Sequence, residues 1–129
     1  MAQVRSKVDV YSIIKGMYVR GVDALFDTEA RSTFISDDLA SMVGYHKYEK
    51  PKPVPLAVKG MEGEVIGWSP VRFVINGKEI PYTTVVQVVK GLREPVIIGT
   101  SYMEEFRIRL DLEEGRPYLE TYPPRVELI

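Results

Sequence analysis

The sequence predicts an all-β domain with one or two short helices. Short runs of β-branched and aromatic residues recur along the chain, and glycine, proline or asparagine separates one run from the next, as in strands joined by tight turns. Asn76-Gly77 stands between two such runs, and both residues tolerate the positive φ of a type I′ hairpin turn. At 129 residues the chain has the size of one domain, so we expect a single domain over residues 1–129.

The predicted strands follow these runs in order. They cover residues 8–14, 18–26, 54–59, 64–75, 79–89, 107–112 and 118–122. Lys15-Gly16 and Glu114-Gly115 are expected turns, and the second would join its neighbouring strands as an antiparallel pair. Residues 45–55 contain three lysines and three prolines, which predicts an exposed loop or an extended edge.

Only two helices are indicated. Ser36 is a candidate N-cap for a short helix, because Asp37 and Asp38 would lie at its positive end and Gly44 would stop it. Ser101 is expected to cap a second helix that runs through Phe106.

Composition excludes several classes of function. The chain is 45% hydrophobic and 27% charged, with a formal net charge of -1, and it has no lysine or arginine block of the kind that nucleic acids or anionic membranes require. It has no cysteine, which rules out disulfides, thiol nucleophiles and zinc–thiolate sites. The first residues lack the apolar core of a secretory signal, and no apolar stretch approaches the roughly 20 residues of a membrane span. We therefore expect a cytoplasmic protein, and its scarcity of asparagine and glutamine favours a heat-adapted source.

Asp27 is the residue that points to chemistry. It ends the mostly apolar run 22–26, a position where an aspartate by itself usually begins a turn. However, ALFDTEARSTFIS resembles the ALxDTGAxxTFIS signature of the retropepsin-like aspartic protease family. VIIGTSYMEEFRIRLDLEEGRPYL resembles the family's second signature, and VKGMEGEVIG lies where these enzymes have a flap hairpin. The resemblance covers roughly residues 18–122.

This resemblance implies a retropepsin-like half-barrel with one lobe per chain, and a homodimer that hydrolyses a peptide or protein substrate without a metal or organic cofactor. Two carboxylates must share one proton in this chemistry, so Asp27 would pair with its symmetry mate. Thr28 would lock the two loops together, and Ala30 would line the cleft. Ile97-Ile98-Gly99 would pack behind the aspartate loop. Four residues would form the hinge or tip of the flap, namely Gly60, Met61, Glu62 and Gly63.

Glu29 departs from the family pattern, which has glycine there. Its side chain would enter the substrate space and could disturb the loop, since glycine adopts φ values that are closed to glutamate. Two Asp27 and two Glu29 carboxylates near one axis would repel each other unless Arg31 forms an ion pair with Glu29. A catalytically impaired dimer that binds peptides or proteins, or serves assembly, is therefore the alternative function, and a divalent cation site is a third.

His46, the single histidine, lies in a polar stretch without a nearby serine or acidic cluster. We expect a surface histidine there and neither a catalytic triad nor a histidine metal site.

Overall fold

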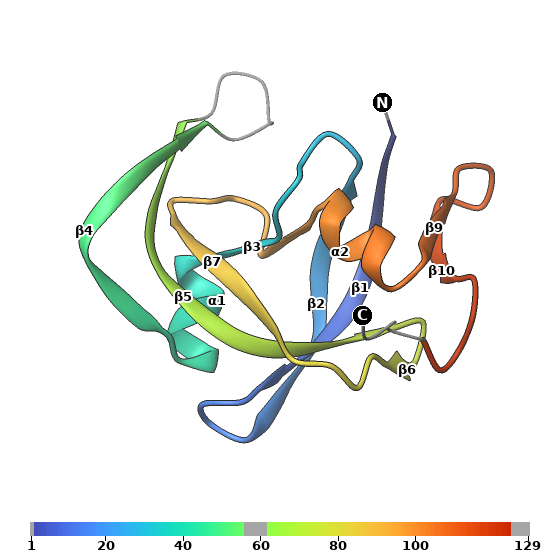
Figure 1. The fold of residues 1–129 in the computed structure, drawn as a ribbon, viewed down its shortest axis with the longest axis horizontal. Coiled ribbons are helices and arrows are strands. Elements are labelled where there is room, and N and C mark those ends of the chain that lie inside the picture. Colours follow the sequence, from blue (N-terminus) through green and yellow to red (C-terminus); the bar gives the residue numbers. More distant parts are fainter. Residues whose placement is uncertain (1, 56–61, 125–129) are drawn as a thin grey trace, which may run out of the picture.

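The computed structural model describes residues 2–55 and 62–124. The strands are β1 (Gln3–Ser12), β2 (Met17–Asp27), β3 (Phe34–Ser36), β4 (His46–Pro55), β5 (Glu62–Ile75), β6 (Lys78–Glu79), β7 (Thr84–Lys90), β8 (Val96–Ile98), β9 (Ile108–Asp111) and β10 (Arg116–Leu119). The helices are α1 (Asp37–Val43) and α2 (Thr100–Glu105). The all-β class with two short helices is thus confirmed (Figure 1).

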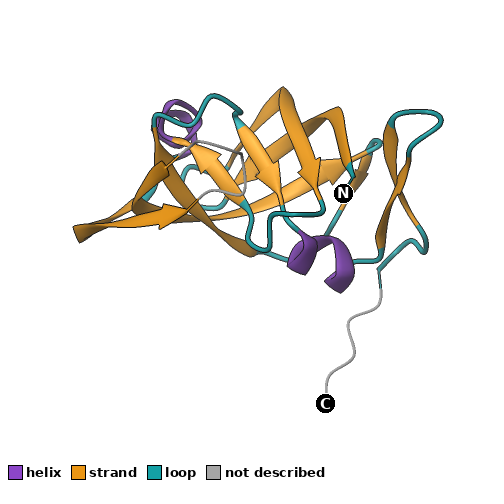
Figure 2. Cartoon of the chain, turned by 90° about the horizontal axis from the view of Figure 1, so that it is seen from above, coloured by secondary structure: helices purple, strands orange, loops and turns teal. Residues whose placement is uncertain are grey.

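Six strands form a closed ring. Neighbouring strands pair in the order β1-β2-β8-β3-β7-β5, and β5 also pairs with β1, which closes the barrel. β4 continues the sheet beyond β5 as an edge strand, whereas β9 and β10 form a separate two-stranded sheet. In Figure 2 this hairpin stands to one side of the barrel, beyond α2.

The predicted turns are confirmed. Asn76 (φ 53°) and Gly77 (φ 72°) join β5 to β6 with Ile75 opposite Lys78, and Gly16 (φ 61°) and Gly115 (φ 65°) turn the β1–β2 and β9–β10 hairpins. Several strand limits were wrong. The run 79–89 is interrupted after Glu79, where Pro81 has no N–H for a ladder. β3 and β8 were missed as strands because each has only three residues, all buried, without alternation.

Residues 46–55 belong to β4, so the prediction of an extended edge is correct for this segment and that of a loop is wrong. β4 pairs only with β5 among the described residues, and an edge strand tolerates the prolines and lysines that a central strand excludes. β1 begins at Gln3, five residues earlier than predicted, and pairs with β2 along its whole length.

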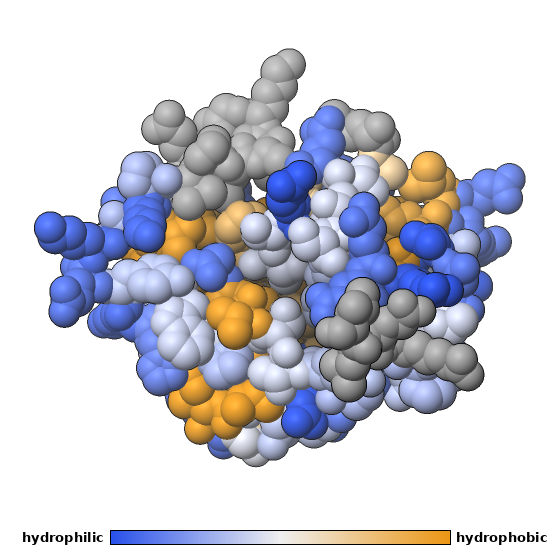
Figure 3. All heavy atoms as spheres, in the orientation of Figure 1, coloured by the Kyte–Doolittle hydropathy of each residue, from blue (hydrophilic) through white to orange (hydrophobic). Residues whose placement is uncertain are grey.

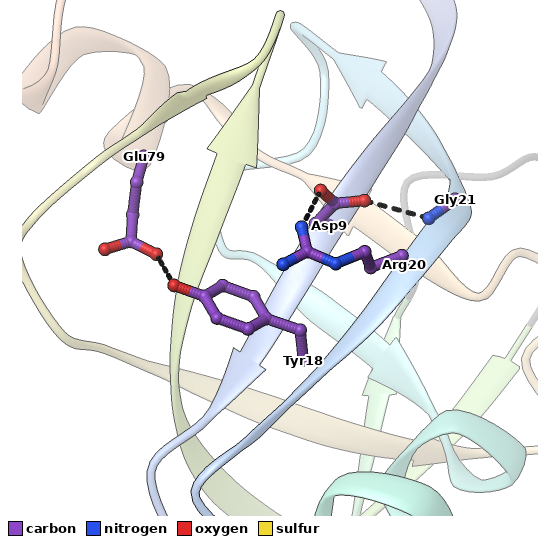
Figure 4. Close-up of polar contacts among 5 residues, drawn as sticks. All are labelled: Asp9, Tyr18, Arg20, Gly21 and Glu79. Atoms are coloured by element: carbon purple, nitrogen blue, oxygen red, sulfur yellow. Dashed lines mark hydrogen bonds and ion pairs between the residues drawn. The ribbon is translucent and has the colours of Figure 1, made fainter.

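A β-bulge at Arg20 and Gly21 of β2, opposite Asp9 of β1, shapes the outer side of the β1–β2 hairpin. The Asp9 carboxylate accepts hydrogen bonds from the Gly21 backbone N–H and from Arg20, each at 2.9 Å, and the Arg20 guanidinium lies 4.3 Å from the centre of the Tyr18 ring (Figure 4). The Tyr18 hydroxyl donates to Glu79, next to the Asn76-Gly77 turn. These contacts stabilise the bulge and tie the hairpin to β6.

The two helices begin in different ways. The Ser36 hydroxyl accepts a hydrogen bond from the Leu39 N–H at 3.1 Å, and Gly44 ends α1, as predicted. The prediction that Ser101 caps the second helix is wrong, because α2 begins after Gly99, which has no side chain to cap it. No helix in the described part of the chain is long and apolar enough to cross a membrane.

One large apolar cluster fills the barrel. Its fully buried members include Phe26 from β2 and Phe73 from β5, and both helices add residues from their inner faces. A second, smaller cluster of buried residues contains Phe34 and Ala30. Tyr102 of α2 is buried in the large cluster, and this burial raises the pKa of its hydroxyl.

Candidate active site

Asp27 ends β2 between two partner strands. β8 runs parallel to β2 with Phe26 opposite Ile98, and β1 runs antiparallel with Gln3 opposite Asp27. The residues before Asp27 at the end of β2 are apolar because this part of the strand is buried. The Asp27 carboxylate therefore lies at the edge of the core. Asp27 is completely buried in the single chain.

Both carboxylate oxygens of Asp27 accept hydrogen bonds. Oδ1 accepts from the Glu29 backbone N–H at 2.9 Å, and Oδ2 accepts from the Gln3 side-chain amide at 3.3 Å. The Asp27 carbonyl accepts from the Ala30 N–H at 3.2 Å. A carboxylate that binds an N–H two residues ahead forms an Asx turn, so Asp27 shapes the loop that follows it.

Thr28 is exposed and bonds entirely to Ala2. Its backbone N–H donates to the Ala2 carbonyl at 3.0 Å, its hydroxyl donates to the same carbonyl at 3.1 Å, and that hydroxyl accepts from the Ala2 N–H at 2.8 Å. Ala2 and Gln3 were not predicted from the sequence as neighbours of Asp27. The early start of β1 brings them there, and the polar–apolar alternation of the first residues is the signal that could have revealed it.

Glu29 adopts an ordinary backbone conformation. No non-glycine residue of the loop 28–33 has a positive φ, so the expected disturbance of loop geometry does not occur. Glu29 and Arg31 are both exposed and do not form the ion pair that the sequence allowed. That pair assumed an extended chain, in which residues two apart share a side, whereas the chain turns between Asp27 and Ala30.

Gly99 lets the loop pass close to the start of α2. A Cβ atom on Gly99 would lie 2.3 Å from the Ser32 carbonyl oxygen and 2.6 Å from the Arg31 carbonyl oxygen. The first N–H groups of α2 donate to this loop, from Thr100 to the Ala30 carbonyl at 2.7 Å and from Ser101 to the Arg31 carbonyl at 3.0 Å. These carbonyls take the place of a side-chain cap, and they explain why Ser101 does not serve as one.

The stretch Ile97-Ile98-Gly99 therefore lies directly behind the aspartate loop. The Gly99 N–H donates to the buried Thr33 hydroxyl at 3.2 Å, which adds a further tie between the two segments. The parallel pairing of β2 with β8 holds the strand that delivers Asp27, and the helix start holds the loop after it.

Ala30 lies in the second apolar cluster, next to the Asp27 loop. Six further buried residues and the partly buried Tyr48 share this cluster: Leu25, Phe34, Val65, Val89, Leu92 and Ile97. These residues come from β2, β3, β5, β7, β8 and the chain between β7 and β8. The cluster thus connects the aspartate loop with the long β4–β5 hairpin.

The flap residues lie partly outside the described chain. Gly60 and Met61 fall in the segment that the structure does not describe. Glu62 and Gly63 belong to β5, where they pair with Pro55 and Val54 of β4. Gly63 is therefore a strand residue in the arm of the hairpin, and its role as part of a flap stays a prediction.

A groove of about 380 Å³ opens beside Thr28. It is lined by Ala2, Thr28, Met103, Ile108, Leu110 and Leu112, with Glu104 and Arg109 among its polar residues. Leu112 is 64% exposed, and Figure 3 shows apolar atoms at the surface over β9. The aspartate loop is thus bordered by apolar surface on the side of the β9–β10 hairpin.

The other candidates stay away from Asp27. His46 is exposed, with its ring centre 4.4 Å from that of Trp68, so the prediction of a surface histidine is correct. Within residues 2–55 and 62–124, no three histidine, aspartate or glutamate residues gather as a metal site would require.

Two solved structures share this architecture. The retroviral protease-like domain of Ddi1 from Leishmania major is similar with a TM-score of 0.63 and 14% identity, over 94% of this chain and 90% of that chain. EIAV protease, solved with the inhibitor HBY-793, is similar with a TM-score of 0.59 and 16% identity, over 85% of this chain and 93% of that chain. No protein-family model and no curated protein matches the sequence. The retropepsin-like fold predicted from the two signatures is confirmed.

Proposed function

We propose that this chain is one half of a homodimeric aspartic-type endopeptidase. In this proposal the Asp27 carboxylates of two chains share one proton. One of them takes a proton from the attacking water, and the other donates a proton to the carbonyl oxygen of the scissile peptide bond. The reaction needs no metal and no organic cofactor.

The observation that carries the proposal is the way this fold presents Asp27. The aspartate ends a buried strand, its Oδ1 binds the Glu29 N–H at 2.9 Å, and the loop after it is cradled by Gly99. A catalytic carboxylate must be held within a fraction of an ångström of its working position. The hydrogen bonds from Thr100 and Ser101 to the loop supply such rigidity.

The chain offers one aspartate of this kind, so the mechanism requires a second copy related by a two-fold axis. Thr28 is exposed at the edge of the aspartate loop, and the apolar groove beside it includes Leu110 and the strongly exposed Leu112. Apolar surface of this kind supports a protein contact. We place the proposed two-fold axis next to Thr28 on this account.

The substrate in this proposal is an extended peptide with apolar side chains near the scissile bond. The apolar cluster around Phe34 and Ala30 adjoins Asp27 and continues to Val65 in β5. The β4–β5 hairpin, with Gly60, Met61, Glu62 and Gly63, would close over that peptide. Its backbone would pair with the hairpin and the aspartate loop, as extended peptides do with sheet edges.

Replacing Asp27 with asparagine tests the enzyme. Asp27→Asn keeps the shape of the side chain and removes the proton chemistry, so cleavage of unstructured peptides should fall by at least about 10²-fold. Asp23→Asn is the matched control, because Asp23 lies on the same strand with a side chain that is 69% exposed, and it should leave the rate unchanged. The enzyme proposal is wrong if wild type cleaves nothing from acidic to neutral pH and behaves like Asp27→Asn.

A catalytically impaired binding or assembly module is the second candidate, and Glu29 is the observation that favours it. Glu29 is exposed directly beside Asp27, where a carboxylate would occupy substrate space and repel negative charge. If this reading holds, wild type is inert and Glu29→Gly gains peptidase activity. Ser32→Gly, an exposed position in the same loop, is the control that should gain none.

A further inference from the structure

The beginning of β1 covers the aspartate loop of its own chain. Ala2 bonds Thr28 through three hydrogen bonds of 2.8 to 3.1 Å, and the Gln3 amide donates to Asp27 Oδ2 at 3.3 Å. Neither contact is needed to complete the barrel. Val4, the next residue, already belongs to the apolar core.

Beneath this cover Asp27 is closed to solvent. The residue has no exposed surface, and its two oxygens accept from Gln3 and from the Glu29 backbone. A general base must lie within hydrogen-bond reach of the water that it activates. With Gln3 on Oδ2 and no exposed carboxylate surface, a nucleophilic water has no access to this carboxylate.

The same cover occupies the groups that a second copy needs. Thr28 offers one N–H donor and one hydroxyl to any partner, and all of them bond to Ala2. In the proposed dimer these groups would face the other chain across the two-fold axis. Ala2 therefore competes with the second copy for Thr28.

We propose that residues 2 and 3 form an autoinhibitory contact, which occludes Asp27 and occupies the N–H and hydroxyl of Thr28 in the single chain, and which must withdraw before the loop meets a second copy. The inhibitory effect rests on the proposed function, because it presupposes a dimeric peptidase. The contact itself lies within one chain.

Residues 2 and 3 can withdraw without unfolding the rest of β1. Gln3 is exposed and Ala2 is half-buried, whereas Val4 and Val8 are buried in the core. Strand ends held by a few exposed hydrogen bonds open far more readily than core strands. Residues 2 and 3 can thus peel away with Val4 as the fixed point, and the rest of β1 keeps its pairing with β2 and β5.

The double substitution Ala2→Pro/Gln3→Leu tests the contact. Proline removes the N–H that Ala2 gives to Thr28 and is tolerated at the start of a strand, and leucine removes the amide that binds Asp27. The Ala2 carbonyl still accepts from Thr28, but the strand end loses two of the hydrogen bonds that hold it, so it opens more often and exposes the Thr28 amide. Lys7→Leu is the control, because Lys7 lies on the same exposed side of β1, away from Asp27. The Phe26 amide should remain protected in all variants, which verifies that the barrel is folded.

Two readouts on dilute, monomeric protein decide whether the occlusion exists. We expect the Thr28 amide to exchange with deuterium about tenfold faster in the double variant, the change that loss of about 1.4 kcal/mol gives. Carbodiimide labelling of Asp27, located by mass spectrometry, should rise in parallel. Unchanged Thr28 exchange and unchanged Asp27 labelling would overturn the inference.

Sedimentation and peptide cleavage separate this inference from the proposed function. If wild type dimerises, the double variant should dimerise about tenfold more tightly, and an equal or weaker dimer would overturn the competition while the enzyme proposal stands. If neither chain dimerises or cleaves peptides although Thr28 becomes unprotected, the occlusion is supported and the proposed homodimer fails.

Discussion

Gly99→Ala should be among the most damaging single-methyl changes in this chain. The added Cβ would lie 2.3 Å from the Ser32 carbonyl oxygen and 2.6 Å from the Arg31 carbonyl oxygen, and both are backbone atoms that no side-chain rotation can move. Gly99 has φ −93° and ψ 175°, which alanine adopts freely. The cost therefore comes from close approach and not from backbone strain.

The magnitude follows from what has to move. Overpacking of this kind costs about 1–3 kcal/mol. Displacing the loop also weakens the hydrogen bonds from Gly99, Thr100 and Ser101, each of which contributes about 0.5–1.5 kcal/mol. Alanine recovers only about 0.4–1 kcal/mol by restricting the unfolded chain. We expect a net loss of about 3 kcal/mol in the free energy of unfolding.

Urea denaturation at a single low protein concentration measures this loss. With an m-value of roughly 1–3 kcal/mol/M, the midpoint should fall by about 1–3 M urea. Gly115→Ala is the control, since a Cβ there meets nothing within 4 Å and its φ of +65° alone should cost about 1–2 kcal/mol. A midpoint for Gly99→Ala no lower than that of Gly115→Ala would refute the role of close approach.

Two further predictions concern stability away from the site. Ser36→Ala removes the hydrogen bond that the Ser36 hydroxyl accepts from the Leu39 N–H and should lower the free energy of unfolding, measured by urea titration, by about 1 kcal/mol. Ser41→Ala in the same helix should change it by less than about 0.5 kcal/mol, and equal effects would contradict the role of Ser36 as a cap. Hydrogen bonding to Glu79 raises the pKa of Tyr18, so this bond stabilises the fold below the ordinary tyrosine pKa of about 10 and is lost as the pH rises through the folded value. The stability difference between wild type and Tyr18→Phe should therefore shrink at alkaline pH, and a constant difference would disprove the linkage.

Local signals in the sequence predicted the parts of the fold that depend on few residues. Asn76-Gly77 encodes its own turn because both residues accept positive φ, and Ser36 with its following aspartates encodes the start of α1. The prediction of Ser101 as a cap was wrong because the first N–H groups of a helix can donate to carbonyls of a distant loop in place of a capping side chain. The short buried strands β3 and β8 carry no alternation, so only their pairing inside the barrel identifies them.

The sequence alone contained the aspartate motif and, through its resemblance to the retropepsin-like family, predicted the order of elements and the packing of Ile97-Ile98-Gly99 behind the aspartate loop, because the resemblance depends on residue types and their order along the chain. Only the tertiary structure decided what surrounds Asp27. The pairing of Gln3 with Asp27 follows from the length of the β1–β2 ladder, the turn after Asp27 separates Glu29 from Arg31, and the bonds of Thr28 to Ala2 join residues 26 positions apart. Contacts of that kind arise from closing a barrel, and no local pattern specifies them.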